Sequence, residues 1–147
     1  IAITLPDGSV RQYENPLTVL DIATDISEGL ARNVLSAKFN GETLEASTRI
    51  EADGDLRLFT WNDDEGKTAF WHSSAHILAQ SLLALYPTAK LTIGPAIENG
   101  FYYDVDFGGD SFSEKDLPAL EKQFLTFARE KFAFSMRSSS KADALAF

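Results

Sequence analysis

Alternation of apolar and polar positions opens the chain and predicts a β-hairpin. Residues 1–5 alternate as a strand does, Pro6-Asp7-Gly8-Ser9 is typical of a turn, and residues 10–14 alternate again. A second hairpin is predicted over residues 35–44, because Asn40-Gly41 separates two strand-like runs and suits a tight two-residue turn.

Helical spacing lies between the two hairpins. Thr18 suits an N-cap, residues 27–31 suit a short second helical turn, and Ile50 with residues 56–59 suits the last strand. Four apolar residues follow the cap at the spacing of one helix face: Val19, Ile22, Ala23 and Ile26. The predicted order ββαβββ, within about 60 residues, resembles the ubiquitin-like β-grasp.

Residues 67–86 predict one long helix, which Pro87 ends. A strand and bend are expected at 91–95, followed by a hairpin whose tip spans 97–101 and whose second strand continues to residue 107.

The last third of the chain predicts two further helices. The pair Ser113 and Asp116 resembles a capping box and begins a helix that ends near Lys131. A strand is expected at 132–136, and Ser140 is expected to begin a second helix.

These elements predict an α+β protein with two domains. The charged, breaker-rich stretch 62–66 is interpreted as a linker between a β-grasp domain at 1–61 and a second α+β domain at 67–147. The chain starts at Ile1 rather than Met and stops at Phe147 inside a predicted helix, so we expect a piece of a longer protein.

Composition narrows the function classes. The chain has no cysteine, which excludes a disulfide framework and any cysteine-based metal site or nucleophile within it. No apolar run approaches the roughly 20 residues that cross a bilayer, so we expect a cytoplasmic protein without a membrane partner. Of the net charge of −9, residues 1–65 carry −8 and residues 66–147 carry −1, which argues against generic phosphate-backbone binding by the first domain.

The two histidines of the chain, His72 and His76, lie four residues apart on the long predicted helix. This spacing puts both rings on one helix face, where they could bind a metal or serve acid–base chemistry. Zinc usually takes three or four protein ligands, so the pair is at most half a metal site. Two exposed histidines without any function remain an alternative at this point.

The segments around the histidines are similar to a known family. His72-Ser-Ser-Ala-His76, followed by Ile93-Gly-Pro-Ala-Ile-Glu-Asn-Gly-Phe-Tyr-Tyr-Asp104, resembles the proofreading domain of threonyl-tRNA synthetases. The opening segment Ile3-Thr-Leu-Pro-Asp-Gly-Ser9 and residues 34–41 resemble the TGS domain that precedes it in the bacterial enzymes.

The resemblance implies a site that hydrolyses seryl-tRNA(Thr). His72 and His76 would position the hydrolytic water and hold or protonate the terminal ribose hydroxyl, and Tyr103 would orient the substrate. The family completes this site with a downstream Cys-x-x-x-His segment, which the chain lacks. We therefore expect an incomplete site that is inactive by itself, with apolar surface exposed at Phe132, Phe134 or Phe147.

The resemblance also implies partners and cofactors. The acceptor end of tRNA(Thr) is the expected partner, and threonine ligation would need ATP, Mg²⁺ and Zn²⁺ in a catalytic domain outside the chain. No cofactor or metal is expected within these residues. The parent enzyme is expected to form a homodimer through parts outside the chain, so the chain itself could be monomeric.

Two alternatives remain open at this point. One is a ubiquitin-like interaction module without chemistry. The other is a metal hydrolase in which His72 and His76 bind zinc together with a carboxylate such as Asp104.

Overall fold

The computed structural model describes residues 1–132 and 139–146. These residues divide into two compact units, the first made of 1–76 with 90–106 and the second of 77–89 with 107–147. Among the described residues, no helix is long and apolar enough to cross a membrane.

The first unit begins with the predicted β-grasp. A five-stranded sheet has the order β2-β1-β7-β4-β5, and β1 pairs with β7 in parallel while every other neighbour is antiparallel. The strands are β1 (Ala2–Thr4), β2 (Val10–Gln12), β4 (Ser36–Phe39), β5 (Glu42–Leu44) and β7 (Gly54–Phe59). Both predicted hairpins are confirmed. Asn40 and Gly41 have φ values of 48° and 89°, the left-handed conformation that a tight two-residue turn requires.

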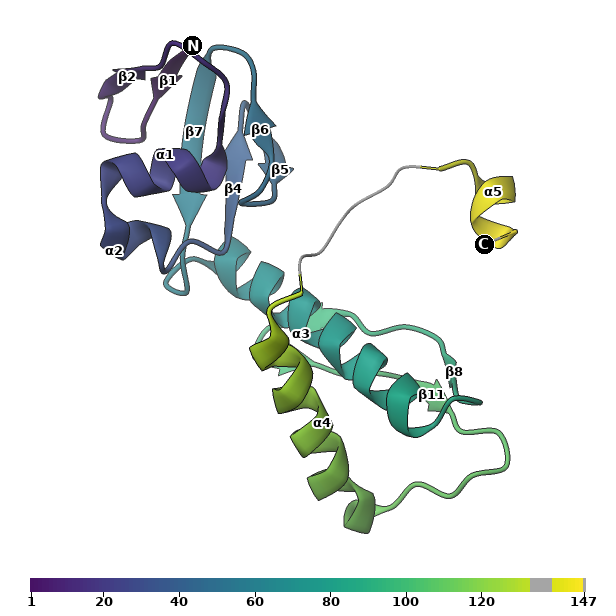
Figure 1. The fold of residues 1–147 in the computed structure, drawn as a ribbon. Coiled ribbons are helices and arrows are strands. Elements are labelled where there is room, and N and C mark those ends of the chain that lie inside the picture. The colour runs from purple at the N-terminus through teal and green to yellow at the C-terminus, as the bar shows by residue number, and fades with distance from the viewer. Residues whose placement is uncertain (133–138, 147) are drawn as a thin grey trace. The chain divides into compact units, whose positions relative to one another are not determined.

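Helix α1 (Val19–Ile26) covers one face of this sheet (Figure 1). Thr18 is its N-cap, as predicted, and it forms a capping box with Asp21. The core between helix and sheet consists of fully buried residues, namely Ile3, Val19, Ile22, Ala37, Ile50 and Leu56. Helix α2 (Glu28–Ala31) follows, with Ser27 as its cap.

Ile50 was expected in the last strand with residues 56–59, which is wrong, because it belongs to a separate strand pair that was not predicted. β3 (Leu17–Thr18) pairs with β6 (Arg49–Ile50) as a separate antiparallel ladder beside the main sheet. A two-residue strand has no periodicity of its own, so only the tertiary pairing defines it.

Helix α3 spans Asp64–Leu85, three residues earlier at its start than predicted. Residues 64–66 of the predicted linker are therefore helical. Asp63 fixes the start, because its backbone oxygen accepts from the Lys67 amide at 3.0 Å while its carboxylate accepts from the Thr60 amide at 2.9 Å.

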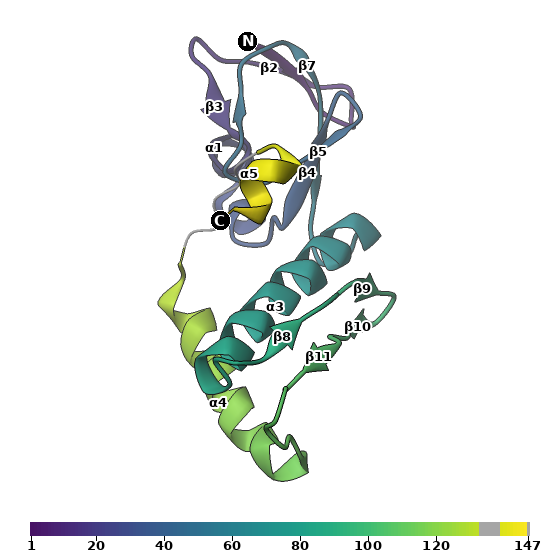
Figure 2. The ribbon, with the colours of Figure 1, turned by 90° about the vertical axis from the view of Figure 1, so that its right-hand side faces the viewer.

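The predicted hairpin after α3 is present in a more broken form. β9 (Ala96–Ile97) pairs with β10 (Gly100–Phe101), and β8 (Lys90–Leu91) pairs with β11 (Val105–Asp106). The continuous strand expected over 101–107 is wrong at residues 102–104 and at 107, which belong to no strand. The β9–β10 hairpin lies beside the first half of α3 (Figure 2).

The second unit contains the end of α3, the 3₁₀ turn Glu114–Asp116, α4 (Leu117–Glu130) and α5 (Lys141–Leu145). The predicted capping pair Ser113–Asp116 is present, and Ser140 begins α5 as predicted, its hydroxyl accepting from the Asp143 amide. Its buried apolar residues are Ala79, Leu82, Ala89 and Leu120. Three half-buried aromatic rings also contact one another: Phe107 stacks on Phe112 at 4.8 Å, and Tyr86 meets both edge-on.

Exposed apolar surface was predicted at three phenylalanines near the end of the chain. Phe132 is 63% exposed, as expected. The other two, Phe134 and Phe147, lie outside the described residues, as does most of the strand predicted for 132–136.

Candidate active site

Helix α3 presents the two histidines as a contacting pair. The Nε2 atoms of His72 and His76 lie 3.0 Å apart, and their rings meet at 83° with centroids 4.5 Å apart. At this distance one Nε2 must donate and the other must accept, so at least one ring is neutral. Both side chains are exposed, and a water or hydroxyl group therefore has access to them.

The environment of His76 favours its neutral form. Partial burial lowers the pKa of His76 below its ordinary value of 6.5, and the neighbouring His72 lowers it further. A neutral imidazole at pH 7 can accept a proton from water, which is the property that a general base needs.

The two residues immediately before His76 on α3 have small, buried side chains. Ala75 is 2% exposed, and Ser74 is buried with its hydroxyl donating to the Phe70 carbonyl at 2.8 Å. Because its hydroxyl is satisfied within the helix, Ser74 can be buried at little cost. Ser74 lies about 180° around the helix from the midpoint of positions 72 and 76, so the two histidines face away from this buried side.

Tyr103 lies in the same compact unit as the histidine pair, packed against Gly94. A Cβ atom at position 94 would overlap the Tyr103 ring, so only glycine permits this approach. Backbone hydrogen bonds join the segments that carry Gly94 and Tyr103. The Thr92 amide donates to the Asp104 carbonyl at 3.1 Å, and the Asp104 amide donates to the Ile93 carbonyl at 3.0 Å. The role of Tyr103 in binding substrate stays a prediction.

A hollow of about 440 Å³ lies between the start of α3 and the β9–β10 hairpin, and we call it the Trp71 hollow. Its lining comes from two segments: Asp64, Lys67, Thr68 and Trp71 of α3, and Ala96, Ile97, Glu98 and Asn99 of the hairpin. Sequence reasoning missed it. The i, i+3 and i+4 spacing of 64, 67, 68 and 71 indicates a shared helix face, but nothing local indicates which hairpin covers that face.

Aromatic contacts hold the Trp71 ring in place. Trp71 meets Trp61 and Phe70 edge-on, with centroids 5.5 and 5.3 Å away, and Phe101 of β10 lies 6.2 Å away. Such edge-to-face pairs stabilise a defined ring position.

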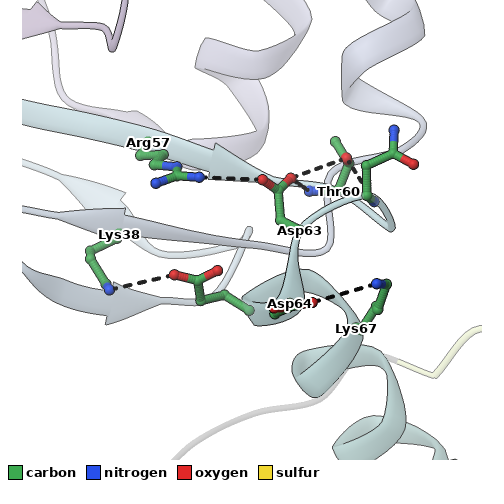
Figure 3. A network of polar contacts seen from close by, with 8 residues as sticks. Lys38, Arg57, Thr60, Asp63, Asp64 and Lys67 are labelled. Carbon is green, nitrogen blue, oxygen red and sulfur yellow. Dashed lines mark hydrogen bonds and ion pairs between the residues drawn. The ribbon is translucent and has the colours of Figure 1, made fainter. Parts of the chain in front are cut away.

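A polar network joins the β-grasp sheet to the first turn of α3 (Figure 3). Arg57 pairs with Asp63 at 3.4 Å, and Lys38 pairs with Glu65 at 3.8 Å. Hydrogen bonds from Thr60 and the charge of Arg57 lower the pKa of Asp63, so the carboxylate that begins the helix stays ionised near neutral pH.

The metal-hydrolase alternative lacks a ligand set. Within residues 1–132 and 139–146, no three histidine, cysteine, aspartate or glutamate side chains converge in a way that could hold a metal ion. His72, His76 and Asp104 therefore do not form the three-ligand site that the alternative requires.

The chain matches known proteins over nearly its whole length. The TGS domain family matches residues 1–60. The chain is 56% identical over 145 residues to a threonine–tRNA ligase of Flavobacterium psychrophilum, covering 99% of the chain and 22% of that relative. It is 58% identical over 147 residues to that of Cytophaga hutchinsonii, covering 100% of the chain and 23% of the relative. The homologues of this chain are threonine–tRNA ligases.

These matches confirm the resemblance inferred from the sequence, and they confirm a TGS domain with the β-grasp fold. The chain spans less than a quarter of the length of the curated threonine–tRNA ligases named above. The predicted limits of the linker and of the second domain, and the roles of His72, His76 and Tyr103, stay predictions.

Proposed function

We propose that the chain is the amino-terminal region of a threonine–tRNA ligase and that residues 67–147 form part of a site that hydrolyses seryl-tRNA(Thr). The observation that carries the proposal is the His72–His76 contact, with Nε2 atoms 3.0 Å apart on an exposed helix face, in a chain whose homologues are threonine–tRNA ligases.

A threonine-specific ligase needs a second site because serine differs from threonine by one methyl group. A missing methyl group changes binding by only about 1–3 kcal/mol, which is too little for faithful translation. Hydrolysis of the wrong ester restores the accuracy that binding alone does not supply.

The histidine pair suits ester hydrolysis by water. When substrate enters, an oxygen-bearing group would replace the direct Nε2–Nε2 contact, donating to the accepting ring and accepting from the donating ring. Attack of water on the seryl ester breaks the bond to the ribose oxygen, and the proton from water reaches that oxygen as it leaves. Neutral His76 is suited to hold the attacking water, and His72 to donate toward the ribose hydroxyl. Tyr103 would orient the substrate.

The remaining functions of the ligase belong, in this proposal, to regions outside the chain. Those regions would bind ATP, Mg²⁺ and Zn²⁺, form the homodimer and supply the Cys-x-x-x-His segment of the proofreading site. The partner is the acceptor end of tRNA(Thr), and the place of action is the cytoplasm, where aminoacyl-tRNA is used.

The test is hydrolysis of seryl-tRNA(Thr) by the ligase that contains this chain, with threonyl-tRNA(Thr) as the second substrate. We expect selective seryl hydrolysis that falls at least about 100-fold in His72→Ala and His76→Ala, the range of a lost acid–base group. Thr24→Ala, at an exposed position of α1 outside the proposed site, is the control and should keep full activity. Unchanged hydrolysis in both histidine variants would remove the pair from the reaction.

A further inference from the structure

The Trp71 hollow has features that the ester-hydrolysing site does not use. One wall is the half-buried Trp71 ring, and polar groups surround it: the carboxylates of Asp64 and Glu98, the ammonium group of Lys67 and the amide of Asn99. An aromatic wall inside a polar rim fits a flat ligand that stacks on one side and forms hydrogen bonds at its edge.

Charge restricts the ligand further. Two carboxylates and one ammonium group line the Trp71 hollow, so a phosphate group would meet net repulsion there. A neutral ring that carries an amino group is favoured, because carboxylate oxygens accept hydrogen bonds from it. Glu and Asp accept from the amino group of cytosine, and Asn forms paired bonds with adenine.

The position of the hollow relates it to the histidine pair. Thr68, His72 and His76 follow one another at intervals of four residues, so they form one row along α3. Thr68 lies at the edge of the hollow nearest this row, about 6 Å along the helix axis from His72, while Trp71 lies about 100° around the helix from His72. A single nucleotide unit can span that step.

We propose that the Trp71 hollow binds the unpaired base next to the esterified nucleotide at the 3′ end of tRNA, and that it selects a base with an exocyclic amino group. The base stacks on Trp71, and its amino group donates to Glu98 at the hairpin tip. Uracil is disfavoured, because it places a carbonyl oxygen where cytosine has its amino group. The inference rests on the proposed proofreading function.

Binding can be measured without hydrolysis. The chain has two tryptophans, so Trp61→Phe leaves Trp71 as its sole tryptophan, whose emission can be excited apart from that of the tyrosines. Titration with an acceptor-stem RNA that carries no amino acid should quench the Trp71 emission when the penultimate nucleotide is cytidine. The quenching should be much weaker when that nucleotide is uridine. Equal quenching by both RNAs, or quenching by neither, would overturn the proposal. Quenching by an arginine-rich peptide alone would assign the Trp71 hollow to a protein side chain instead.

Hydrolysis by the intact ligase gives the second measurement. Trp71→Ala should raise KM for seryl-tRNA roughly 5- to 30-fold with kcat unchanged, because loss of base stacking weakens binding by about 1–2 kcal/mol. The KM of Trp71→Phe should lie between those of the unmodified ligase and Trp71→Ala. A fall in kcat with KM unchanged would show that Trp71 only supports the structure.

A change of base preference is the sharpest result. Glu98→Gln replaces an acceptor with an amide that can also donate, so discrimination against penultimate uridine should shrink, while Glu121→Gln on α4 serves as the matched charge control. If Glu98→Gln kept the full preference for cytidine over uridine, the proposed contact between Glu98 and the amino group of the base would be wrong. If the unmodified ligase hydrolyses no seryl-tRNA, the proofreading function fails, and the fluorescence titration separately decides whether the hollow binds a base.

Discussion

Gly66 and Thr60 approach each other so closely that a Cβ atom at position 66 would overlap the Thr60 carbonyl oxygen. The last residues of the β-grasp therefore pack directly on the first turn of α3. Glycine is required here by space, since its φ is not in the left-handed region.

Gly66→Ala should destabilise the chain by about 1–3 kcal/mol, because the added methyl group must displace backbone. Urea unfolding followed by circular dichroism measures this change. Gly29→Ala is the control: position 29 lies in α2 with its nearest neighbour atom at 3.8 Å, so alanine should stabilise by about 0.5–1 kcal/mol. Equal effects at the two positions would contradict the close approach at Gly66.

Gly94 and Tyr103 should show strong coupling. Gly94→Ala is expected to destabilise by about 1–3 kcal/mol, since the methyl group overlaps the ring. In the background of Tyr103→Ala the same change should cost little, because the ring is gone. A double-mutant cycle in urea measures the difference, and additive effects would show that the two residues do not press on each other.

The N-cap of α1 gives a third prediction. The Thr18 hydroxyl accepts from the Asp21 amide at 3.1 Å, and the Asp21 carboxylate accepts from the Thr18 amide at 3.0 Å. Thr18→Ala should cost about 1 kcal/mol. Thr24→Ala, which removes an exposed hydroxyl within the same helix, should change the free energy of unfolding by less than about 0.5 kcal/mol. If Thr24→Ala lowered the free energy of unfolding as much as Thr18→Ala does, the N-cap role of Thr18 would be wrong.

The lowered pKa of His76 predicts a dependence of stability on pH. The pKa in the folded state lies below the ordinary 6.5, so the unfolded chain takes up a proton first as the pH falls. This contribution to stability is complete above pH 6.5 and is lost as the pH falls through the folded pKa. His76→Gln should therefore lose less stability than the unmodified chain between pH 7.5 and 5.5. Equal losses of stability in the unmodified chain and in His76→Gln would show that the His76 pKa is unshifted.

Much of the β-grasp could be predicted because its signals are local. Thr18 marks a helix start by a hydroxyl that reaches three residues ahead, and Asn40-Gly41 marks a turn by its own backbone preference. The β3–β6 ladder could not be predicted, since Leu17 meets Ile50 only after the chain has folded. Residues 64–66 were assigned to the linker because glycine and acidic residues are typical of connectors, whereas Asp63 and the packing against Thr60 make them helical.

The candidate site likewise has one feature that local sequence predicts and others that depend on tertiary structure. The shared face of His72 and His76 follows from helical spacing, but the 3.0 Å contact depends on side-chain rotamers that spacing does not determine. The Trp71 hollow depends on a hairpin more than 25 residues further along the chain, so no local pattern indicates it.

The parallel pairing of β1 with β7 determines when, during synthesis, the sheet can be completed. Ile3 in β1 lies opposite Gly54, so the first strand made waits for nearly the last strand of the domain before its central ladder can form. The β1–β2 and β4–β5 hairpins can form early, because their strands are neighbours in sequence. On the ribosome the TGS domain should therefore become protease-resistant in one step, once β7 has left the exit tunnel, and α3 follows directly behind it.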